Sequence, residues 1–275
     1  MNREDIVVLW KTCFGDSEEY IDFFINNCPQ YICIQYWLEN ELVSMLFLLE
    51  GNLCNNKAKY LYAACTHPDF RRKGIMEELI KYSEKYCKAL GYSAIFLVPA
   101  NKQLYDYYNK FGFSASFRRN CVSLTPEHSA SGLDFKETSD IDKILSLRKK
   151  LVAKYDSFIF EDSVMKYSFK EHLYNGGKIL VSDNAEQSAL IFYYKDGSNI
   201  IVKELLCSSD EVYGAVIKHF HNKNVENLYI CTPIVYNCKD KVGEYTKCGM
   251  CLALNDEMSV FLTTHNNLYA ALYLD

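Results

Sequence analysis

The chain has 275 residues, of which 49% are apolar and 15% aromatic, so it can bury a sizeable core and does not have the composition of a disordered protein. This length exceeds that of most single domains and predicts two of them. The formal net charge of −5 is spread without long runs, which argues against nucleic acid as a partner, because a phosphate backbone calls for a basic face.

The 12 cysteines are dispersed through apolar patterns, which indicates reduced, mostly buried thiols and not a disulfide framework. The N-terminal stretch, MNREDIVVLWKTC, carries acidic residues and lacks the apolar run of a signal peptide. No stretch approaches the roughly 20 apolar residues that span a bilayer. We therefore expect a cytoplasmic protein with no membrane partner.

The first part of the chain has the pattern of two helices followed by strands. Helices are predicted over 3–14 and 17–27, separated at Gly15, and Asp16 and Glu19 have capping-box spacing for the second helix. Residues rich in β-branched and aromatic side chains then predict strands over 31–38, 42–49 and 60–66. Between the last two, residues 51–57 are predicted as a loop, with a short strand within it as the alternative.

The strongest pattern lies between Tyr60 and Phe113. The cationic turn Arg71-Arg72-Lys73-Gly74 separates a strand from an amphipathic helix that begins at Ile75, and Gly91 follows as a stop signal. A tight turn that opens a helix leaves backbone N–H groups unpaired at the positive end of the helix dipole. The sequence therefore predicts an anion site, and three adjacent cations would suit a multiply phosphorylated ligand.

A short strand, a short helix and a further strand complete the first half, over 94–99, 101–110 and 113–123. The polar segment Thr125–Gly132 marks the boundary, so we predict domains over 1–124 and 133–275. The second half is predicted as a helix, three strands, a helix and a strand: 139–155, 178–182, 188–195, 199–207, 209–222 and 228–232. The order of the first half after its two helices, β-β-β-α-β-α-β, predicts an α/β fold with helices on both faces of a mixed sheet.

The second half repeats the first in a weakened form. The segment 96–99 corresponds to 230–233, and 108–113 corresponds to 245–250. The strand-to-helix junction of the second copy, Cys207 to Glu211, has neither a glycine nor a cation, and its acidic residues would repel phosphate. We therefore predict one fold used twice, with the anion site in the first copy.

Three segments resemble the GNAT (GCN5-related) N-acetyltransferase family. Residues 71–76, RRKGIM, resemble its coenzyme A signature Q/R-x-x-G-x-G/A, residues 107–113 its F-Y-x-K-x-G-F motif, and Thr66-His67-Pro68 its V-x-P. The opening LWKTCFGDSEEYIDFF resembles a bacterial subgroup with a second, degenerate GNAT-like domain. The resemblance implies tandem GNAT-like domains, of which the first binds acetyl-CoA and the second is degenerate.

The resemblance also implies acetyl-CoA as a co-substrate and no metal. The pyrophosphate would meet the amides at the start of the helix, and the pantetheine arm would pair with the edge of the strand 60–66. Met76 departs from the signature, which usually has glycine or alanine there. The implied cofactor-binding residues are Ala64, Cys65, Thr66, Arg71, Arg72, Lys73, Gly74, Ile75, Met76 and Asn101.

In enzymes of this family an amine attacks the thioester directly and a tyrosine protonates the leaving thiolate; Tyr108 holds that position here. A phenol with a reference pKa of about 10 keeps its proton at neutral pH and can donate it. Three residues are candidates for the general base, namely Glu50, His67 and the terminal Asp275. The implied function is N-acetylation of a primary amine on a small molecule or peptide.

Two alternatives stay open on the sequence. One is a catalytically silent acyl-CoA sensor or adaptor, and the other is transfer of an aminoacyl group from tRNA, which would need a basic surface. The oligomeric state is equally open, and a homodimer is compatible with the sequence. Cys248 and Cys251 have CxxC spacing, with Cys238 nearby, but the missing second pair favours packing cysteines over a zinc site.

Overall fold

The computed structural model describes residues 2–125, 133–184, 186–221, 225–233, 244–265, 267–271 and 274. The chain divides into two compact units, each of which combines segments that are distant in sequence. The first unit comprises Met1–Ser116, Phe158–Tyr167 and Gly249–Asn266, and the second Phe117–Ser157, Ser168–Cys248 and Asn267–Asp275. The predicted boundary segment overlaps residues 126–132, which lie outside the described residues.

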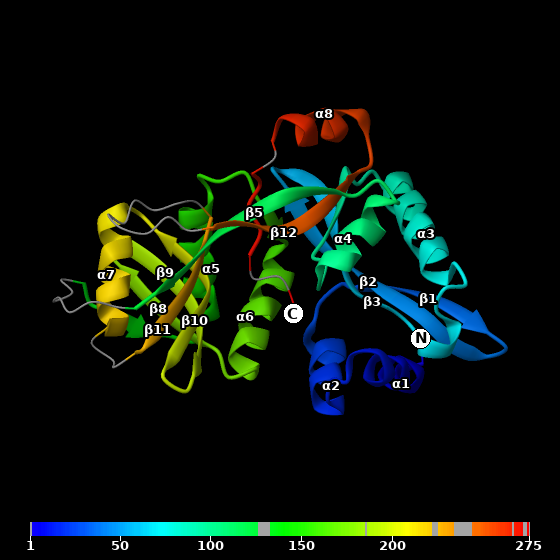
Figure 1. The fold of residues 1–275 in the computed structure, drawn as a ribbon, viewed down its shortest axis with the longest axis horizontal. Coiled ribbons are helices and arrows are strands. Elements are labelled where there is room, and N and C mark those ends of the chain that lie inside the picture. The colour runs from blue at the N-terminus through cyan, green and yellow to red at the C-terminus, as the bar shows by residue number, and fades with distance from the viewer. Residues whose placement is uncertain are drawn as a thin grey trace. The chain divides into compact units, whose positions relative to one another are not determined.

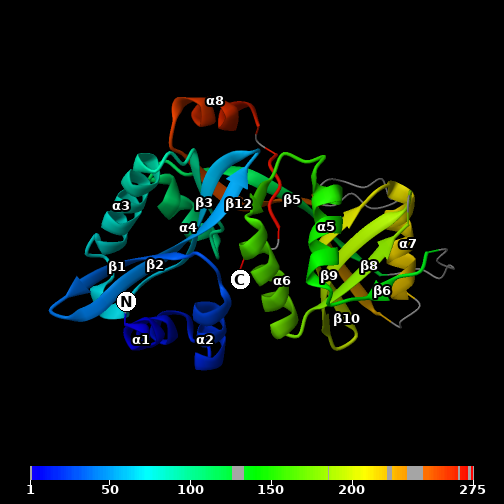
Figure 2. The same ribbon diagram turned by 180° about the vertical axis from the view of Figure 1, so that it is seen from behind.

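The first unit is a mixed sheet with helices on both faces (Figures 1 and 2). Its strands run in the order β1-β2-β3-β4-β12, with β7 paired to β2. The β1–β2, β2–β3 and β4–β12 pairs are antiparallel, and β3–β4 is parallel. The elements are α1 (Arg3–Phe14), α2 (Glu18–Asn27), β1 (Ile32–Leu38), β2 (Glu41–Leu53), β3 (Asn56–Thr66), a 3₁₀ turn (Pro68–Phe70), α3 (Ile75–Ala89), β4 (Ala94–Leu97), α4 (Lys102–Asn109), β7 (Phe158–Phe160), the end of β12 (Glu244–Ala253) and α8 (Asp256–Thr264).

Side chains of β2 alternate between two apolar layers, as the period of a strand requires. Leu46 and Leu48 join the cluster beneath α3 and α4. Phe47 points the other way and meets Trp10 of α1 and Phe24 of α2, with ring centroids 5.3 and 5.1 Å apart. Figure 1 shows α1 and α2 on the face of these strands opposite to α3 and α4. This central sheet fixes where the ends of β3, α1 and α3 meet.

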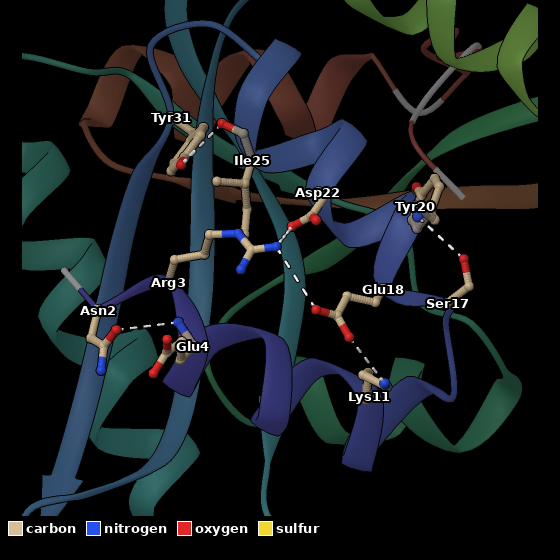
Figure 3. A network of polar contacts seen from close by, with 10 residues as sticks. All are labelled: Asn2, Arg3, Glu4, Lys11, Ser17, Glu18, Tyr20, Asp22, Ile25 and Tyr31. Atoms are coloured by element: carbon tan, nitrogen blue, oxygen red, sulfur yellow. Dashed lines mark hydrogen bonds and ion pairs between the residues drawn. The ribbon is translucent and has the colours of Figure 1, made fainter.

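Polar contacts join α1 to α2 (Figure 3). Arg3 pairs with Asp22 and lies 3.9 Å from Glu18, and Lys11 is 3.5 Å from the same Glu18 carboxylate. Exposed pairs of this kind contribute little individually. Together with the aromatic layer they orient α1, whose last turn reaches the candidate site.

The cap of α2 differs from the prediction. Ser17, not Asp16, is the N-cap, and its hydroxyl accepts a hydrogen bond from the Tyr20 amide at 3.2 Å. The Asp16 carboxylate instead accepts a hydrogen bond from the Trp10 indole at 2.8 Å. A buried indole N–H needs a hydrogen-bond acceptor, so Asp16 accepts from Trp10 and leaves the cap to Ser17.

The second unit repeats the layout of the first. Its strands run in the order β6-β8-β9-β10-β11-β5. The β8–β9, β9–β10 and β11–β5 pairs are antiparallel and β10–β11 is parallel, as in β1-β2-β3-β4-β12. The elements are the later part of β5 (Ser114–Leu124), β6 (Lys136–Glu137), α5 (Ile141–Val152), the end of α6 (Asp162–Tyr174), β8 (Lys178–Asp183), β9 (Ser188–Asp196), β10 (Asn199–Cys207), α7 (Asp210–His221) and β11 (Asn227–Thr232).

This symmetry confirms a mixed α/β fold used twice and shows an exchange of strands. The strand β5, which follows α4 in the chain, pairs with β11 in the second unit, whereas β12 returns to pair with β4 in the first. In each unit the helix between the parallel strands, α3 or α7, packs on the sheet. Each sheet is therefore completed by a strand from the other half of the sequence.

The segment 51–57, predicted as a loop that can hold a short strand, is strand at both ends. The strand β2 continues to Leu53 and β3 begins at Asn56, so only two residues turn the chain. Cys54 and Asn55 both adopt left-handed conformations, with φ of 46° and 67°. Two successive left-handed residues form the tight turn that matches the twist of a hairpin.

The predicted match of 108–113 with 245–250 is wrong. The first segment ends a helix, where Gly112 has a φ of 84°, whereas the second lies in strand β12. Gly249 serves close packing instead, because a Cβ there would lie 2.4 Å from the ring of Phe96. Glycine is thus required at Gly112 by a left-handed backbone and at Gly249 by close packing.

A buried ion pair lies in the second unit. Arg148 of α5 donates two hydrogen bonds of 2.9 Å to Glu204 of β10, and the hydroxyl of Tyr269 donates another of 2.7 Å. Arg148 is 2% exposed and Glu204 is fully buried.

No helix among the described residues is long and apolar enough to cross a membrane.

Candidate active site

A cavity of about 490 Å³ opens in the first unit next to the diverging strands β3 and β4. In the described part of the chain, pairing between these parallel strands ends at Tyr60 and Phe96. The end of β3, the cationic turn, the first turn of α3, the helix α4 and the last turn of α1 all line the cavity. Its volume is in the range of pockets that hold a small ligand.

The cationic turn shapes one wall. Arg72 and Gly74 have left-handed backbones, with φ of 63° and 82°, on either side of Lys73. Alternation of this kind turns successive amides to one side and forms a concave anion-binding nest. A Cβ at Gly74 would have no neighbour within 4 Å, and none of the described side chains caps α3. The start of α3 is therefore open to an anionic ligand.

The side chains of this turn divide their roles. Arg71, Arg72 and Gly74 line the cavity, and the Nε of Arg71 donates a 3.0 Å hydrogen bond to the Thr66 carbonyl. Lys73 does not line the cavity; its ammonium lies 4.8 Å from the Phe70 ring centroid.

Two side chains at the start of α3 also border the cavity. Glu77 is paired with Lys81 at 2.6 Å, which reduces its repulsion of an anion. Met76 packs against the apolar cluster under α3 and lines the cavity as well, so its side chain has found room against the sheet.

The end of β3 provides a second wall. Its pairing with β2 shifts between Met45 and Phe47, where Ala63 adopts a φ of 46°. This bulge bends the strand, and Ala64, Cys65 and Thr66 beyond it line the cavity. The buried Ser44 hydroxyl holds them from behind, donating to the Cys65 carbonyl at 2.8 Å and lying 2.9 Å from the Thr66 hydroxyl.

Helix α4 provides the phenol. Tyr108 is 8% exposed, lines the cavity, and packs against the rings of Tyr107 and Phe113. Burial raises the pKa of Tyr108 well above its usual range, so the phenol keeps its proton at neutral pH. Tyr107 also lines the cavity, and burial raises its pKa too.

Asn101 and His67 have structural contacts. The Asn101 side chain caps α4 by accepting a 3.1 Å hydrogen bond from the Leu104 amide, and it does not line the cavity. The Nδ1 of His67 accepts a 3.3 Å hydrogen bond from the Asp69 amide and so caps the 3₁₀ turn. A ring nitrogen used in this way is a poor proton acceptor for chemistry.

The structure does not bring Glu50 to the cavity that holds Tyr108. Its carboxylate pairs with the buried Lys59 and accepts hydrogen bonds of 2.9 and 3.0 Å from the Tyr92 hydroxyl. Glu50 lines a different cavity of the first unit, of about 510 Å³. Asp275 lies outside the described residues. Assignment of either carboxylate as the base stays a prediction.

Cys13 and Phe14, at the end of α1, also line the cavity, and neither is among the site residues that the sequence predicts. The Cys65 thiol donates a hydrogen bond to Cys13, and this bond, together with Arg71, lowers the pKa of Cys13 to about 7. The same bond and burial raise the pKa of Cys65 well above its usual range. One signal in the sequence could have pointed to Cys13: it lies two residues before Gly15, which ends α1, and functional residues are frequent where an element meets a loop.

The corresponding junction of the second unit lacks these features. Ser209 accepts a 3.4 Å hydrogen bond from the Val212 amide near the start of α7, and the first turn carries Asp210 and Glu211. The neighbouring Ser209 hydroxyl lowers the pKa of Glu211, which keeps it charged. This helix start is therefore unsuited to phosphate.

No group of His, Cys, Asp or Glu side chains within the described residues could hold a metal ion. Cys248 and Cys251 are both buried in β12. Residues three positions apart in a strand point to opposite faces, so these two thiols are poorly placed to share a ligand. Cys238 lies outside the described residues.

Comparison with known proteins agrees with this geometry. A sequence profile of the acetyltransferase (GNAT) family matches residues 3–113, which include the whole candidate site. No curated protein sequence matches the chain.

Solved structures match nearly the whole chain. A probable N-acyltransferase of unknown function from Enterococcus faecalis has a TM-score of 0.75 at 12% identity and covers 92% of this chain and 70% of its own. A GCN5-related N-acetyltransferase from Anabaena variabilis has a TM-score of 0.73 at 12% identity, covering 97% and 74%. A tandem GNAT protein from the clavulanic acid biosynthesis pathway has a TM-score of 0.54 at 10% identity, covering 92% and 95%. At these identities the likeness establishes the fold.

Residues 3–113 are thus a GNAT-family domain, and the chain as a whole has the fold of GNAT proteins. The match of this domain supports acyl transfer as the general activity.

Proposed function

We propose that this chain is an acetyl-CoA-dependent N-acetyltransferase that acts on a primary amine of a small molecule or peptide. One observation carries the proposal: a single cavity is lined by the open start of α3, the free end of β3 and the protonated phenol of Tyr108. The first two suit the pyrophosphate and the amide-rich arm of coenzyme A. The third suits a thiolate leaving group.

Acetyl-CoA supplies an activated acetyl group as a thioester. The amides of Arg72 to Met76 would bind its phosphates, and Arg71 and Arg72 would add positive charge at the mouth of the cavity. The backbone N–H groups near Ala64 and Cys65 would polarise the carbonyl. Tyr108 would hold its proton until sulfur leaves, because burial keeps the phenol neutral.

A two-part experiment tests the proposal. Thermal shift with acetyl-CoA measures binding, and release of free thiol over a panel of amines measures turnover. Stabilisation with turnover is the expected result. Stabilisation without turnover of any amine would favour an acyl-CoA sensor, and absence of stabilisation would reject both functions.

A matched pair of variants locates the binding site. Arg72→Ala removes a cation from the cavity, whereas Lys85→Ala removes an exposed cation farther along α3. We expect Arg72→Ala to weaken acetyl-CoA binding about tenfold, the loss of one charge-assisted contact, and Lys85→Ala to leave it unchanged. Equal effects of the two variants would show that overall charge, and not this turn, attracts the cofactor.

A further inference from the structure

Two thiols from different elements meet in the acyl-CoA cavity. Cys13 lies at the end of α1 and Cys65 near the end of β3, and both line the cavity. Their side chains are joined by a hydrogen bond, with Cys65 as the donor and Cys13 as the acceptor. Neither thiol is needed for the proposed amine acetylation, in which Cys65 contributes only its backbone.

The surroundings give the two sulfurs different chemistry. The Cys65 hydrogen bond and the Arg71 guanidinium lower the pKa of Cys13 and so stabilise its thiolate. Cys65 is 6% exposed and remains a thiol. Cys33, elsewhere in the first unit, shows the contrast, because burial raises its pKa to about 12. One partially exposed thiolate beside one buried thiol is the arrangement of an attacking and a resolving cysteine.

We propose that Cys13 and Cys65 are a redox-active pair, modified by low-molecular-weight disulfides and closed to a reversible intramolecular disulfide inside the acyl-CoA cavity. The chemistry of the modifying compound is R–S–S–R. Oxidised glutathione and the disulfide of coenzyme A both have it.

The reaction balances in two exchange steps. The Cys13 thiolate attacks one sulfur of R–S–S–R, so that the bond between the two R-bearing sulfurs breaks and one RS⁻ leaves. Cys65 then loses its proton and attacks the Cys13 sulfur of the mixed disulfide, which expels the second RS⁻. Two protons end on two RSH molecules, the two cysteines lose two electrons, and the small disulfide gains them.

The disulfide would also affect the proposed enzyme, and this part rests on the proposed function. A Cys13–Cys65 bond ties the end of α1 to β3 and removes a thiolate and a thiol from the cavity wall. Because Ala64, Cys65 and Thr66 are the residues expected along the cofactor arm, locking Cys65 to α1 restrains them. Acetyl-CoA affinity and thiol release are therefore expected to fall several-fold on oxidation and to recover with dithiothreitol.

Peptide mapping of the full-length protein tests the pair directly. The reduced protein is incubated with oxidised glutathione or, in a separate arm, with coenzyme A disulfide; free thiols are then blocked with iodoacetamide, and cross-linked peptides are identified by mass spectrometry. A link between Cys13 and Cys65 is expected. Mapping is essential because Cys121 and Cys231, opposite each other on β5 and β11 with sulfurs 2.9 Å apart, could link as well. A faster reaction with coenzyme A disulfide alone would identify that compound as the source, and equal rates would indicate a general redox response.

Controls separate the pair from general oxidation. Cys13→Ala and Cys65→Ala should each abolish this link and the dithiothreitol-reversible change in acetyl-CoA affinity, each variant being compared with its own reduced form. Circular dichroism of each variant confirms that it folds. In wild type, alkylation of Cys13 should be at least about tenfold faster than that of Cys33 at pH 7, with a midpoint near pH 7.

Three results would overturn the proposal: no Cys13–Cys65 peptide in either arm, alkylation of Cys33 as fast as that of Cys13, or a link that leaves acetyl-CoA affinity unaltered. Failure of the proposed function looks different. In that case the reduced protein does not bind acetyl-CoA, while the mapped link still forms.

Discussion

Replacing Tyr108 with phenylalanine removes one hydroxyl from the cavity and tests its assignment as the proton donor. General acids typically contribute about 10²–10⁴-fold to a rate. At about 1.36 kcal/mol per factor of ten, the variant is expected to raise the activation free energy by about 3–5 kcal/mol. The Tyr108 hydroxyl makes no hydrogen bond to any residue that the structure describes, so the free energy of unfolding should change by less than about 1 kcal/mol.

Steady-state thiol release, measured with saturating acetyl-CoA and a responsive amine, gives kcat and KM for the variant. We expect kcat to fall and KM to stay close to that of wild type, because the proton moves only as the thiolate leaves. Tyr105→Phe, on the same helix but outside the cavity lining, is the matched control and should retain wild-type kcat. A wild-type kcat in Tyr108→Phe, or an equal loss in Tyr105→Phe, would refute the assignment.

Three further substitutions test the framework. Glu204→Gln leaves the Arg148 guanidinium unpaired in the core and should lower the free energy of unfolding by about 3–5 kcal/mol in urea; a loss below 1 kcal/mol would contradict it. Glu50→Gln likewise strands the buried Lys59 and should cost about 3 kcal/mol, and a pH–rate profile of unchanged shape would exclude Glu50 as the base. Gly74→Ala forces a side chain into a φ of 82°, so it should destabilise by about 1–2 kcal/mol by thermal or urea unfolding, and wild-type stability would show that the turn rearranges freely.

The elements of the first half could be predicted from the sequence, because they have periodic apolar patterns and local turn and helix-end residues. The helix 3–14 matches α1, and the strand, cationic turn and helix around Gly74 occur where the pattern places them. The candidate site could be predicted for the same reason: Thr66, Arg71, Gly74 and Tyr108 lie in three segments, between the end of β3 and α4, that resemble motifs of one family. These residues are close in sequence, so their contact with one cavity depends on few distant contacts.

Features that depend on contacts between residues distant in sequence could not be predicted from sequence patterns. The helix α6 was not predicted, because residues around most of its circumference are buried, among them Val164, Met165, Tyr167 and Phe169, and no single apolar face remains. The strands β6 and β7 and the helix α8 were not predicted either. The two strands have only two and three residues, and the strand before α8 was matched to residues 108–113. Gly249 suggested a false match with Gly112. A glycine is required at position 249 because the ring of Phe96, distant in sequence, leaves no room for a Cβ.

The place of Cys13 depends on tertiary structure too. A cysteine on the apolar side of a helix has many packing roles, and only the meeting of α1 with β3 brings it to Cys65 and Arg71. The distance of Glu50 from the Tyr108 cavity also depends on tertiary structure. Glu50 lies near the far end of β2, beside Lys59, where the long hairpin carries it away from the cavity.

The exchange of β5 and β12 has a consequence for synthesis on the ribosome. Leu97 of β4 pairs with Met250 of β12, about 150 residues later, so β4 has an open edge until nearly the whole chain has emerged. Closing so long a loop is slow, and an unpaired buried strand is prone to aggregate in the meantime. A nascent chain that has released residues 1–113 therefore carries every residue that lines the candidate cavity but lacks the strand that completes its sheet. The first unit is therefore expected to mature late, in step with the second unit, and truncation after residue 124 would yield an incomplete sheet.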